Sequence, residues 1–295
     1  MDTKKYEVFE KTVELSSLTR AAEELGLTQS GVSHILSALE EEFGLPLMKR
    51  SRTGARLTAE GEQLLPYIRE IVRQDKLLYE KAALLRGGVE GTVRIGTFTS
   101  VATHWLPAMM KEFQSEYPRV QFRLFNGDYH DVDQWLRDGS VDLGFIALPA
   151  ASEEWETLPL RDDELLAVLP VGHPLSSLER CRVEDVARQP FISLLESSDH
   201  DARRALERSG VKPNVKYNTK DDYAIMAMVR QGMGVSIMPS LLLRGQDGDL
   251  VCRPLEPASY RTLALALPGG EKTGPAARRF AEFASEWVRR DGADR

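Results

Sequence analysis

The chain has 295 residues, of which 42% are hydrophobic and 28% charged, so it is long enough to form two or three ordinary globular domains. No apolar run reaches the length of a membrane span, and the N-terminus is charged with no apolar stretch behind it, so we expect a cytoplasmic protein with no membrane partner. The two cysteines, Cys181 and Cys252, and the scattered histidines lack the spacing of disulfide frameworks and zinc sites, so we expect no metal and no cofactor.

Residues 18–37, LTRAAEELGLTQSGVSHILS, predict two helices joined by a tight glycine turn. Gly26 stands where the residue after a helix end often takes a positive φ, and Thr19 and Thr28 stand where the N-caps of the two helices are expected. An ordinary surface turn is the plainer alternative, but the coincidence of caps, glycine and apolar spacing favours a helix-turn-helix. The apolar residues that would bury one side of each helix are Ala21, Leu25, Leu27, Val32 and Ile35.

The second of these helices, from Thr28 to Glu41, is predicted to expose polar side chains on the side away from the core. Glutamine can hydrogen-bond an adenine edge through both amide atoms, and serine can donate or accept, so this side is suited to the DNA major groove. Glycine is unfavourable inside a helix, so Gly31 indicates a close approach of the backbone to phosphate or to the neighbouring helix. The candidate DNA-binding residues of this helix are Thr28, Gln29, Ser30, Ser33 and His34.

A basic wing is predicted after Pro46, where LMKRSRTGARLT reads as two short extended runs that turn near Gly54. A charged cluster is often only a solvated surface, but beside a helix-turn-helix it can neutralise DNA phosphates. The first 60 residues hold eight Lys or Arg against ten Asp or Glu, so we expect the distribution of charge to favour DNA, with Glu40 to Glu42 far from the reading edge. The candidate phosphate-binding residues are Lys49, Arg50, Arg52 and Arg56.

A long helix is predicted from Thr58 to Arg86, ending at two glycines. Its apolar residues alternate in steps of four and three, as a coiled-coil seam requires, so we expect it to pair with a second copy. A dimer would place two recognition helices against two half-sites of DNA. The alternative is a monomer in which this helix packs on its own C-terminal domain. The predicted seam consists of Leu64, Ile68, Ile71, Asp75, Leu78, Ala82 and Leu85.

Residues 92–295 alternate between strand and helix patterns, which predicts a parallel sheet covered by helices, followed by a second sheet. The order indicates two lobes, with the last strand and helix rejoining the first lobe. The predicted strands are 92–98, 120–125, 141–148, 165–171, 190–194, 215–219, 235–239 and 260–268, and the predicted helices are 104–117, 131–138, 201–210, 223–234 and 275–290.

The segments TRAAEELGLTQSGVSHILSALEEEFG and LMKRSRTGARLTAEG resemble the winged helix-turn-helix of LysR-type transcriptional regulators, and the later segments extend the resemblance over essentially the whole chain. The family often has Pro-Ala where Ser30-Gly31 stands and Phe where Met48 stands, which leaves the base contacts open. The resemblance implies an α/β protein with an all-α winged helix-turn-helix domain, a long linker helix and a two-lobed effector domain like type 2 periplasmic binding proteins. It also implies a homodimer through the linker helix that assembles into a homotetramer. The implied domains are 1–58, 59–88 and 92–295, with lobe I at 92–161 and 263–295 and lobe II at 162–262.

The resemblance implies a small-molecule effector between the lobes, and in open α/β sheets ligands lie beyond the carboxyl ends of strands. Serine and threonine at strand ends are also common helix caps, which is the plainer interpretation of the same residues. Asp128 and Asp222 disfavour a simple anion and indicate a ligand with an amino group or several hydroxyls. The candidate effector-binding residues are Thr99, Ser100, Asn126, Asp128, Ala147, Leu148, Ser193 and Asp222.

An enzyme is the rival class, because some enzymes share the two-lobed architecture. The chain has no GxGxxG after a strand, no P-loop, no GxSxG and no HExxH, and the stretch from Glu196 to His200 reads as a polar turn before a helix. A transport-linked solute receptor would have no use for residues 1–60 and would carry a signal peptide. The sequence therefore predicts a transcriptional regulator that binds a double-stranded DNA operator under the control of a small-molecule effector.

Overall fold

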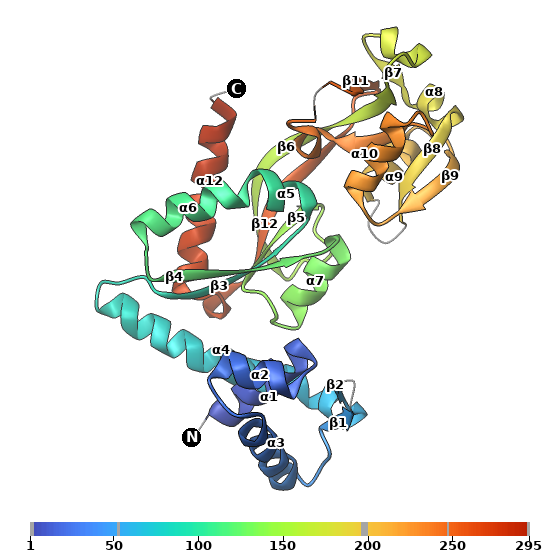
Figure 1. The fold of residues 1–295 in the computed structure, drawn as a ribbon. Coiled ribbons are helices and arrows are strands. Elements are labelled where there is room, and N and C mark those ends of the chain that lie inside the picture. The colour runs from blue at the N-terminus through green and yellow to red at the C-terminus, as the bar shows by residue number, and fades with distance from the viewer. Residues whose placement is uncertain (1–2, 52–53, 196–199, 247, 294–295) are drawn as a thin grey trace. The chain divides into compact units, whose positions relative to one another are not determined.

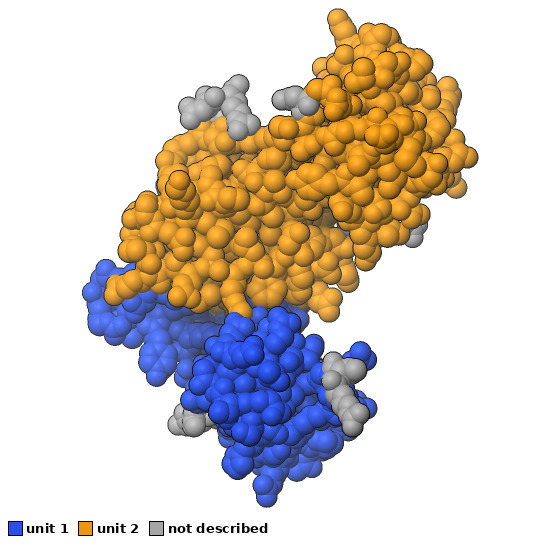
Figure 2. All heavy atoms as spheres, viewed as in Figure 1, with its two compact units in different colours: residues 1–91, 137–140 blue, residues 92–136, 141–295 orange. Residues whose placement is uncertain are grey.

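The computed structural model describes residues 3–51, 54–195, 200–246 and 248–293. Arg52 of the predicted wing and residues 196–199 of the predicted polar turn lie outside the described residues. The chain forms two compact units, one of residues 1–91 with 137–140 and the other of residues 92–136 with 141–295 (Figure 2).

The first unit is a winged helix-turn-helix, as predicted from the sequence (Figure 1). Three helices surround a core in which Phe9, Val32 and Leu36 are buried, because their apolar residues recur every three or four positions. The two wing strands pair antiparallel, with Met48 opposite Leu57. The elements are α1 Lys4–Leu15, α2 Leu18–Leu25, α3 Gln29–Phe43, β1 Met48–Ser51, β2 Gly54–Leu57 and α4 Ala59–Leu85.

The turn between α2 and α3 is built from one glycine and one hydroxyl cap. Gly26 has φ 64°, which glycine adopts without steric cost, and its N–H bonds back to the end of α2. Thr28 accepts a hydrogen bond from the Gly31 N–H at 3.0 Å, so it caps α3 as predicted. The prediction for Thr19 was wrong, because α2 begins at Leu18 and its cap is Ser17, which accepts from the Arg20 N–H.

Gly31 makes room for the cap of its own helix. A Cβ at this position would lie 3.1 Å from the Thr28 hydroxyl and within 4 Å of no neighbouring helix. The predicted close approach to a neighbouring helix is therefore wrong, whereas the predicted approach to a DNA phosphate stays a prediction.

The first half of α4 contributes apolar side chains to the core of its unit, and the second half carries exposed apolar side chains. Ile68 and Val72 are buried in the core of the first unit, against α1 and the wing. Further along, Leu78 is 67% exposed and Leu85 is 79% exposed. The predicted seam therefore divides into a part that packs within its own unit and a part whose apolar side chains face outward.

The second unit contains a mixed sheet that runs through two lobes (Figure 1). Among the described residues the strand order is β4-β3-β5-β12-β6-β11-β7, and β10 also pairs with β6. The strand β3 runs parallel to β5, whereas β12 runs antiparallel to both β5 and β6. The predicted parallel sheet is therefore a mixed sheet, because the last strand returns to lobe I in the opposite direction. The strands are β3 Gly91–Thr97, β4 Val120–Asn126, β5 Leu143–Leu148, β6 Trp155–Pro170, β7 Cys181–Arg182, β10 Ser236–Pro239, β11 Leu250–Glu256 and β12 Tyr260–Pro268, with the parallel pair β8 Pro190–Leu194 and β9 Asn214–Thr219 in lobe II.

Helices cover the sheets of both lobes, and several of them begin where a strand ends. Lobe I holds α5, α6, α7 and α12, and lobe II holds α8, α9 and α10 (Figure 1). The short helix α11 packs its leucines in the core of lobe II. The predicted helix 104–117 is preceded by α5, and the buried Trp105 separates α5 from α6. The helices are α5 Thr99–His104, α6 Leu106–Glu116, α7 Tyr129–Arg137, α8 Val183–Arg188, α9 His200–Arg208, α10 Asp222–Arg230, α11 Ser240–Leu243 and α12 Pro275–Ala293, with short 3-10 turns at Pro174–Ser177 and Gly270–Lys272.

Two long strands connect the lobes. The strands β6 and β12 are paired over the whole of β12, and beyond this pairing β6 continues beside β10 and β11 of lobe II. Thr262 lies opposite Asp162, and the register shifts between Leu263 and Ala264. The chain therefore crosses between the lobes twice, on the neighbouring strands β6 and β12. Side chains on these strands at the crossing can reach both lobes.

Candidate functional site

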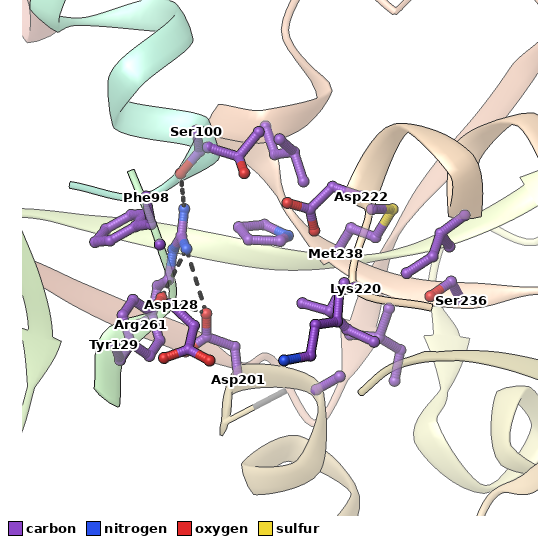
Figure 3. Close-up of a pocket in the computed structure, with 18 of the residues that line it drawn as sticks. Phe98, Ser100, Asp128, Tyr129, Asp201, Lys220, Asp222, Ser236, Met238 and Arg261 are labelled. Carbon is purple, nitrogen blue, oxygen red and sulfur yellow. Dashed lines mark hydrogen bonds and ion pairs between the residues drawn. The ribbon is translucent and has the colours of Figure 1, made fainter. Parts of the chain in front are cut away.

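A cavity of about 300 Å³ lies between the two lobes of the second unit (Figure 3). Lobe I lines it with the residues that follow β3 and β4, where α5 and α7 begin. Lobe II lines it from the starts of α9 and α10 and from β10, and β12 contributes Arg261. The cavity thus lies at strand ends and helix starts, the position at which open α/β sheets bind ligands.

Arg261 connects both lobes through a buried hydrogen-bond network (Figure 3). Its Nε and Nη2 donate to Asp163 Oδ2 at 2.9 and 2.7 Å, and Nη2 also donates to Ser100 Oγ at 2.8 Å. Its Nη1 donates to Tyr129 Oη at 2.8 Å and to Asp201 Oδ2 at 3.3 Å. Ser100 and Tyr129 belong to lobe I and Asp201 to lobe II, so one guanidinium group links the two walls of the cavity.

The partners of Arg261 fix its charge and position. Asp163 also accepts hydrogen bonds from Ser240 Oγ at 2.7 Å and the Leu241 N–H at 2.8 Å, so its carboxylate is held from two sides. Burial alone would lower the pKa of Arg261, but Tyr129, Asp163 and Asp201 outweigh it and raise that pKa above its usual range. The guanidinium group therefore stays cationic at the cavity wall.

The pKa values of two further side chains in the cavity, Tyr129 and Asp222, are raised. Burial raises the pKa of Tyr129 well above its usual value, so its hydroxyl keeps its proton and donates to Asp201 Oδ2 at 2.7 Å. Burial also raises the pKa of Asp222, although a hydrogen bond with the Thr99 side chain and the charge of Arg261 oppose the rise. The cavity thus holds a carboxyl group at Asp222 whose ionised form is incompletely stabilised by the protein itself.

The structure brings five of the eight sequence-predicted effector residues together at this cavity, namely Thr99, Ser100, Asn126, Asp128 and Asp222. The other three do not line it. Ala147 and Leu148 pair with β12 within the sheet, and the Leu148 carbonyl accepts from Arg204 Nη1 at 3.1 Å. Ser193 lies in β8, where its hydroxyl donates to the Leu194 carbonyl.

Sequence reasoning missed the side chains of the buried network, which are Arg261, Tyr129 and Asp201, and found Lys220 only as part of the segment 219–222 at the edge of the predicted cleft. A signal for Arg261 was present, because the predicted crossing of the chain near residue 262 places its neighbours between the lobes. Asp201 begins a predicted helix, and the same rule that selected Asp222 would have selected it. No pattern in the sequence shows that one arginine bonds four segments that are far apart in the chain.

The second candidate surface is the exposed edge of α3 with the wing. Gln29, Ser30 and His34 are exposed, Ser33 is half-buried, and Thr28 caps the helix with its hydroxyl 3.1 Å from Ser30 Oγ. In the described part of the wing, Lys49, Arg50 and Arg56 are exposed. These groups lie on the recognition helix and the wing hairpin, the two elements through which winged domains contact DNA.

Arg50 joins the wing to the recognition helix. Its Nη1 donates to Ser33 Oγ at 2.9 Å, and its Nη2 donates to Ser37 Oγ at 3.1 Å and to Glu40 Oε2 at 2.8 Å. The other oxygen of Glu40 accepts from the N–H groups of Leu47 and Met48. Glu40 is therefore not merely an acidic residue far from the reading edge, since it anchors the first wing strand to α3.

A winged helix-turn-helix and a cavity between two lobes define a DNA-binding protein with a ligand-binding domain. Residues 3–62 match the model of the bacterial regulatory helix-turn-helix proteins of the lysR family, and residues 86–289 match the LysR substrate binding domain. The chain belongs to the LysR family of DNA-binding transcriptional regulators. It is a regulator and not an enzyme, and regulators of this family bind DNA and small-molecule effectors and form oligomers.

Relatives and solved structures agree with this assignment. The chain is 31% identical to the uncharacterized HTH-type transcriptional regulator YvbU of Bacillus subtilis, over 95% of this chain and 96% of the relative. Its fold is similar to a variant of full-length OxyR from Pseudomonas aeruginosa, with TM-score 0.77, 21% identity and coverage of 98% and 95% of the two chains. It is also similar to full-length CbnR solved with its target DNA, with TM-score 0.68, 19% identity and coverage of 97% and 100%.

The comparisons confirm the predicted family, the fold class and the role as a DNA-binding regulator with an effector-binding domain. No helix in the described ranges is long and apolar enough to cross a membrane.

Proposed function

We propose that the cavity between the lobes is the effector site of this regulator and that its occupant controls operator binding. The observation that carries the proposal is the Arg261 network, which bonds Ser100 and Tyr129 of lobe I to Asp201 of lobe II at the cavity wall. A ligand in the cavity touches side chains from both lobes, so it can favour one arrangement of the lobes over another by its difference in affinity for the two.

The DNA surface of this proposal consists of the exposed edge of α3 and the wing. Gln29, Ser30 and His34 contact base edges, and Thr28 and Ser33 lie on the same edge. Lys49, Arg50 and Arg56, together with Arg52 outside the described residues, contact phosphates. Base contacts set sequence preference and phosphate contacts set position, so the two groups carry different parts of operator recognition.

Assembly completes the proposed mechanism. The exposed apolar residues of α4, such as Leu78 and Leu85, support a homodimer formed through this helix. Two-fold symmetry then matches a palindromic operator, and further contacts between dimers give a tetramer. The proposed location is the cytoplasm, where a DNA-binding regulator meets both its operator and its effector.

Thermal shift of the purified full-length protein against a metabolite library tests the effector site. A compound that binds only the folded state at a hundred times its Kd stabilises that state by about 2.7 kcal/mol, which raises Tm. The hit is then added to a footprint of the protein on a DNA site selected in vitro. The proposal expects the footprint or the affinity to change, and expects Thr99→Val with Ser100→Ala to lose the response while DNA binding stays.

Identical footprints with and without every hit would contradict the proposed control of DNA binding. A normal response in the variant that carries both substitutions would contradict the cavity as the effector site.

A further inference from the structure

The charge of the cavity lining is unusual for a site that would bind an anion. Among the described lining residues, four are carboxylates, at Asp128, Asp131, Asp201 and Asp222, and the cationic residues are Lys220 and Arg261. Lys220 is exposed, so solvent and salt screen its charge. The lining therefore carries an excess of negative charge.

Arg261 has no donor left for a ligand. A guanidinium group carries five N–H donors, one on Nε and two on each Nη. The five contacts of Arg261 are two to Asp163 and one each to Ser100, Tyr129 and Asp201. An anionic ligand would have to displace one of these partners, and two of them are carboxylates that would stay buried.

At two of the helix starts that line the cavity, the backbone amides that could receive an anion are used within the chain. Helix starts bind anions through free N–H groups. At the start of α7, Asp128 Oδ1 accepts from the Asp131 N–H at 2.9 Å and Asp131 Oδ2 accepts from the Asp128 N–H at 3.0 Å. At the start of α10, Asp221 Oδ1 accepts from the N–H groups of Tyr223 and Ala224. At both helix starts the chain's own carboxylates stand where a bound anion would stand.

Two carboxyl groups of the cavity have fewer donors from the chain than they can accept. Oδ1 of Asp201 is buried and accepts no hydrogen bond from the part of the chain that the structure describes. Asp222 lies on the opposite side of the cavity from Asp201 in Figure 3, and its hydrogen bond with Thr99 only partly offsets its burial. A buried acceptor without a partner is costly, so donors from a ligand would stabilise both groups.

The carboxylates are spread around the cavity. In the described ranges no three or more His, Cys, Asp or Glu side chains converge as a metal site requires. Separated acceptors suit a molecule that carries its donors at several positions.

We infer that the effector is an organic cation, with protonated amino groups that bind Asp201 and Asp222 from within the cavity; this rests on the proposed function of the cavity as the effector site. The volume of about 300 Å³ is at the low end for small-molecule pockets, so the ligand is of metabolite size. Two ammonium groups on a short aliphatic chain match the separated carboxylates, and the apolar side chains of Ile225 and Met238 line the cavity beside them.

Matched aliphatic probes test the inference on the full-length protein. Calorimetry and thermal shift at constant ionic strength compare the α,ω-diamines of three to six carbons with the dicarboxylates and diols of the same lengths. We expect at least one diamine to bind and raise Tm with concentration, and the dicarboxylates and diols to bind at least about tenfold more weakly, as the loss of a charge-assisted hydrogen bond requires.

Three variants identify the source of the charge preference. Asp222→Asn keeps the shape of the side chain and should weaken diamine binding about tenfold or more. Asp249→Asn removes the same charge from an exposed residue outside the cavity and should leave diamine binding unchanged. Lys220→Met removes a competing cation and should strengthen diamine binding, whereas it would abolish binding of an anion.

The inference is overturned if no diamine binds, if a diol of the same length binds equally well, or if a dicarboxylate binds and loses its affinity in Lys220→Met. When the library screen finds an effector without an amino group that acts through Thr99 and Ser100, only the inference about ligand charge fails. When no hit responds to those two residues, the proposed effector site itself fails.

Discussion

Arg261 of β12 and Asp163 of β6 face each other across the two strands that join the lobes, and they form an ion pair with 2.7 Å between Nη2 and Oδ2. Their side chains are only 4% and 3% exposed. Taking two charges out of water is costly, and their attraction and hydrogen bonds offset that cost only while both partners are present. The pair therefore stabilises the observed register of the crossing strands beside the cavity.

Removing one partner should destabilise the protein strongly. Arg261→Met leaves Asp163 charged and buried, so we expect the free energy of unfolding to fall by about 3–5 kcal/mol, measured by urea denaturation followed by circular dichroism. Adding Asp163→Asn removes the unpaired buried charge and should restore part of the lost stability, because the amide oxygen can still accept a hydrogen bond from the Leu241 N–H. Equal stability of Arg261→Met and the wild type would show that the pair contributes nothing.

The sequence predicted most of the elements that carry regular patterns. The strands β8 and β12 lie at the predicted bounds, and the helices of the DNA-binding domain follow from apolar spacing, caps and glycine. The first half of β6 was missed because residues 155–164 are largely polar and do not alternate regularly between apolar and polar side chains. Their strand conformation is stabilised by pairing with β12 and not by a local pattern. The short β7, α8 and α11 and the strand β11 were also missed, since elements of a few residues depend on tertiary contacts more than on local pattern.

The sequence predicted where the cavity lies but not the hydrogen bonds among the side chains that line it. The strand-end rule found Thr99, Ser100 and Asp222, because it depends only on the order of strands and helices. The contacts of Arg261 depend on register, since it reaches Asp163 only when the two crossing strands pair as they do. Register is a property of the folded sheet, and no local motif encodes it.

Arg50 and Glu40 should act as a coupled pair in DNA binding. Arg50 is bonded to Ser33, Ser37 and Glu40, so its removal frees the wing from α3 as well as removing a charge. We expect Arg50→Ala and Glu40→Gln each to weaken DNA binding, and the double variant to lose less than the sum, with a coupling energy of about 0.5–3 kcal/mol. Fluorescence anisotropy on a selected DNA site measures the three affinities.

Lys49 is the matched control for this pair, because it is exposed on the same strand. Lys49→Ala should weaken binding to all sequences alike and reduce the slope of log K against log salt by about 1. Strict additivity of the Arg50 and Glu40 substitutions would argue that Arg50 contacts only phosphate and does not position the wing.

The outer half of α4 should hold the dimer together. Leu78 and Leu85 are exposed on one chain, and burying such side chains in a second copy removes apolar surface from water. We expect Leu78→Glu to shift the protein toward monomer in sedimentation velocity, because it places like charges opposite each other at the seam. Lys81→Glu changes charge on the same exposed half of the helix and should leave the assembly intact. A dimer that persists in Leu78→Glu with Leu85→Glu would place the interface elsewhere.

Asp222 should lower the stability of the folded protein as pH rises, whereas an ion-paired carboxylate with a lowered pKa would increase it. Burial raises its pKa in the folded state, against the Thr99 hydroxyl on α5 and the charge of Arg261 on β12, and with smaller contributions from the carboxylates of Asp221 and Asp201. Between the ordinary pKa of aspartate and the raised one, the folded state binds more protons than the unfolded state. Stability contributed by this group therefore falls as pH rises through that window, and the penalty is complete above the folded pKa.

Asp222→Asn removes this penalty, so its Tm should exceed that of the wild type near neutral pH, and the difference should shrink as pH falls below the ordinary pKa of aspartate. Thermal unfolding of both proteins across the acidic range measures the difference, and Asp249→Asn provides the comparison for loss of a charge at an exposed residue. Binding of a diamine should have the opposite dependence, becoming tighter as pH rises, because the ammonium group pairs with the ionised carboxylate. A Tm difference between Asp222→Asn and the wild type that stays constant across the range would show that Asp222 titrates alike in the folded and unfolded protein.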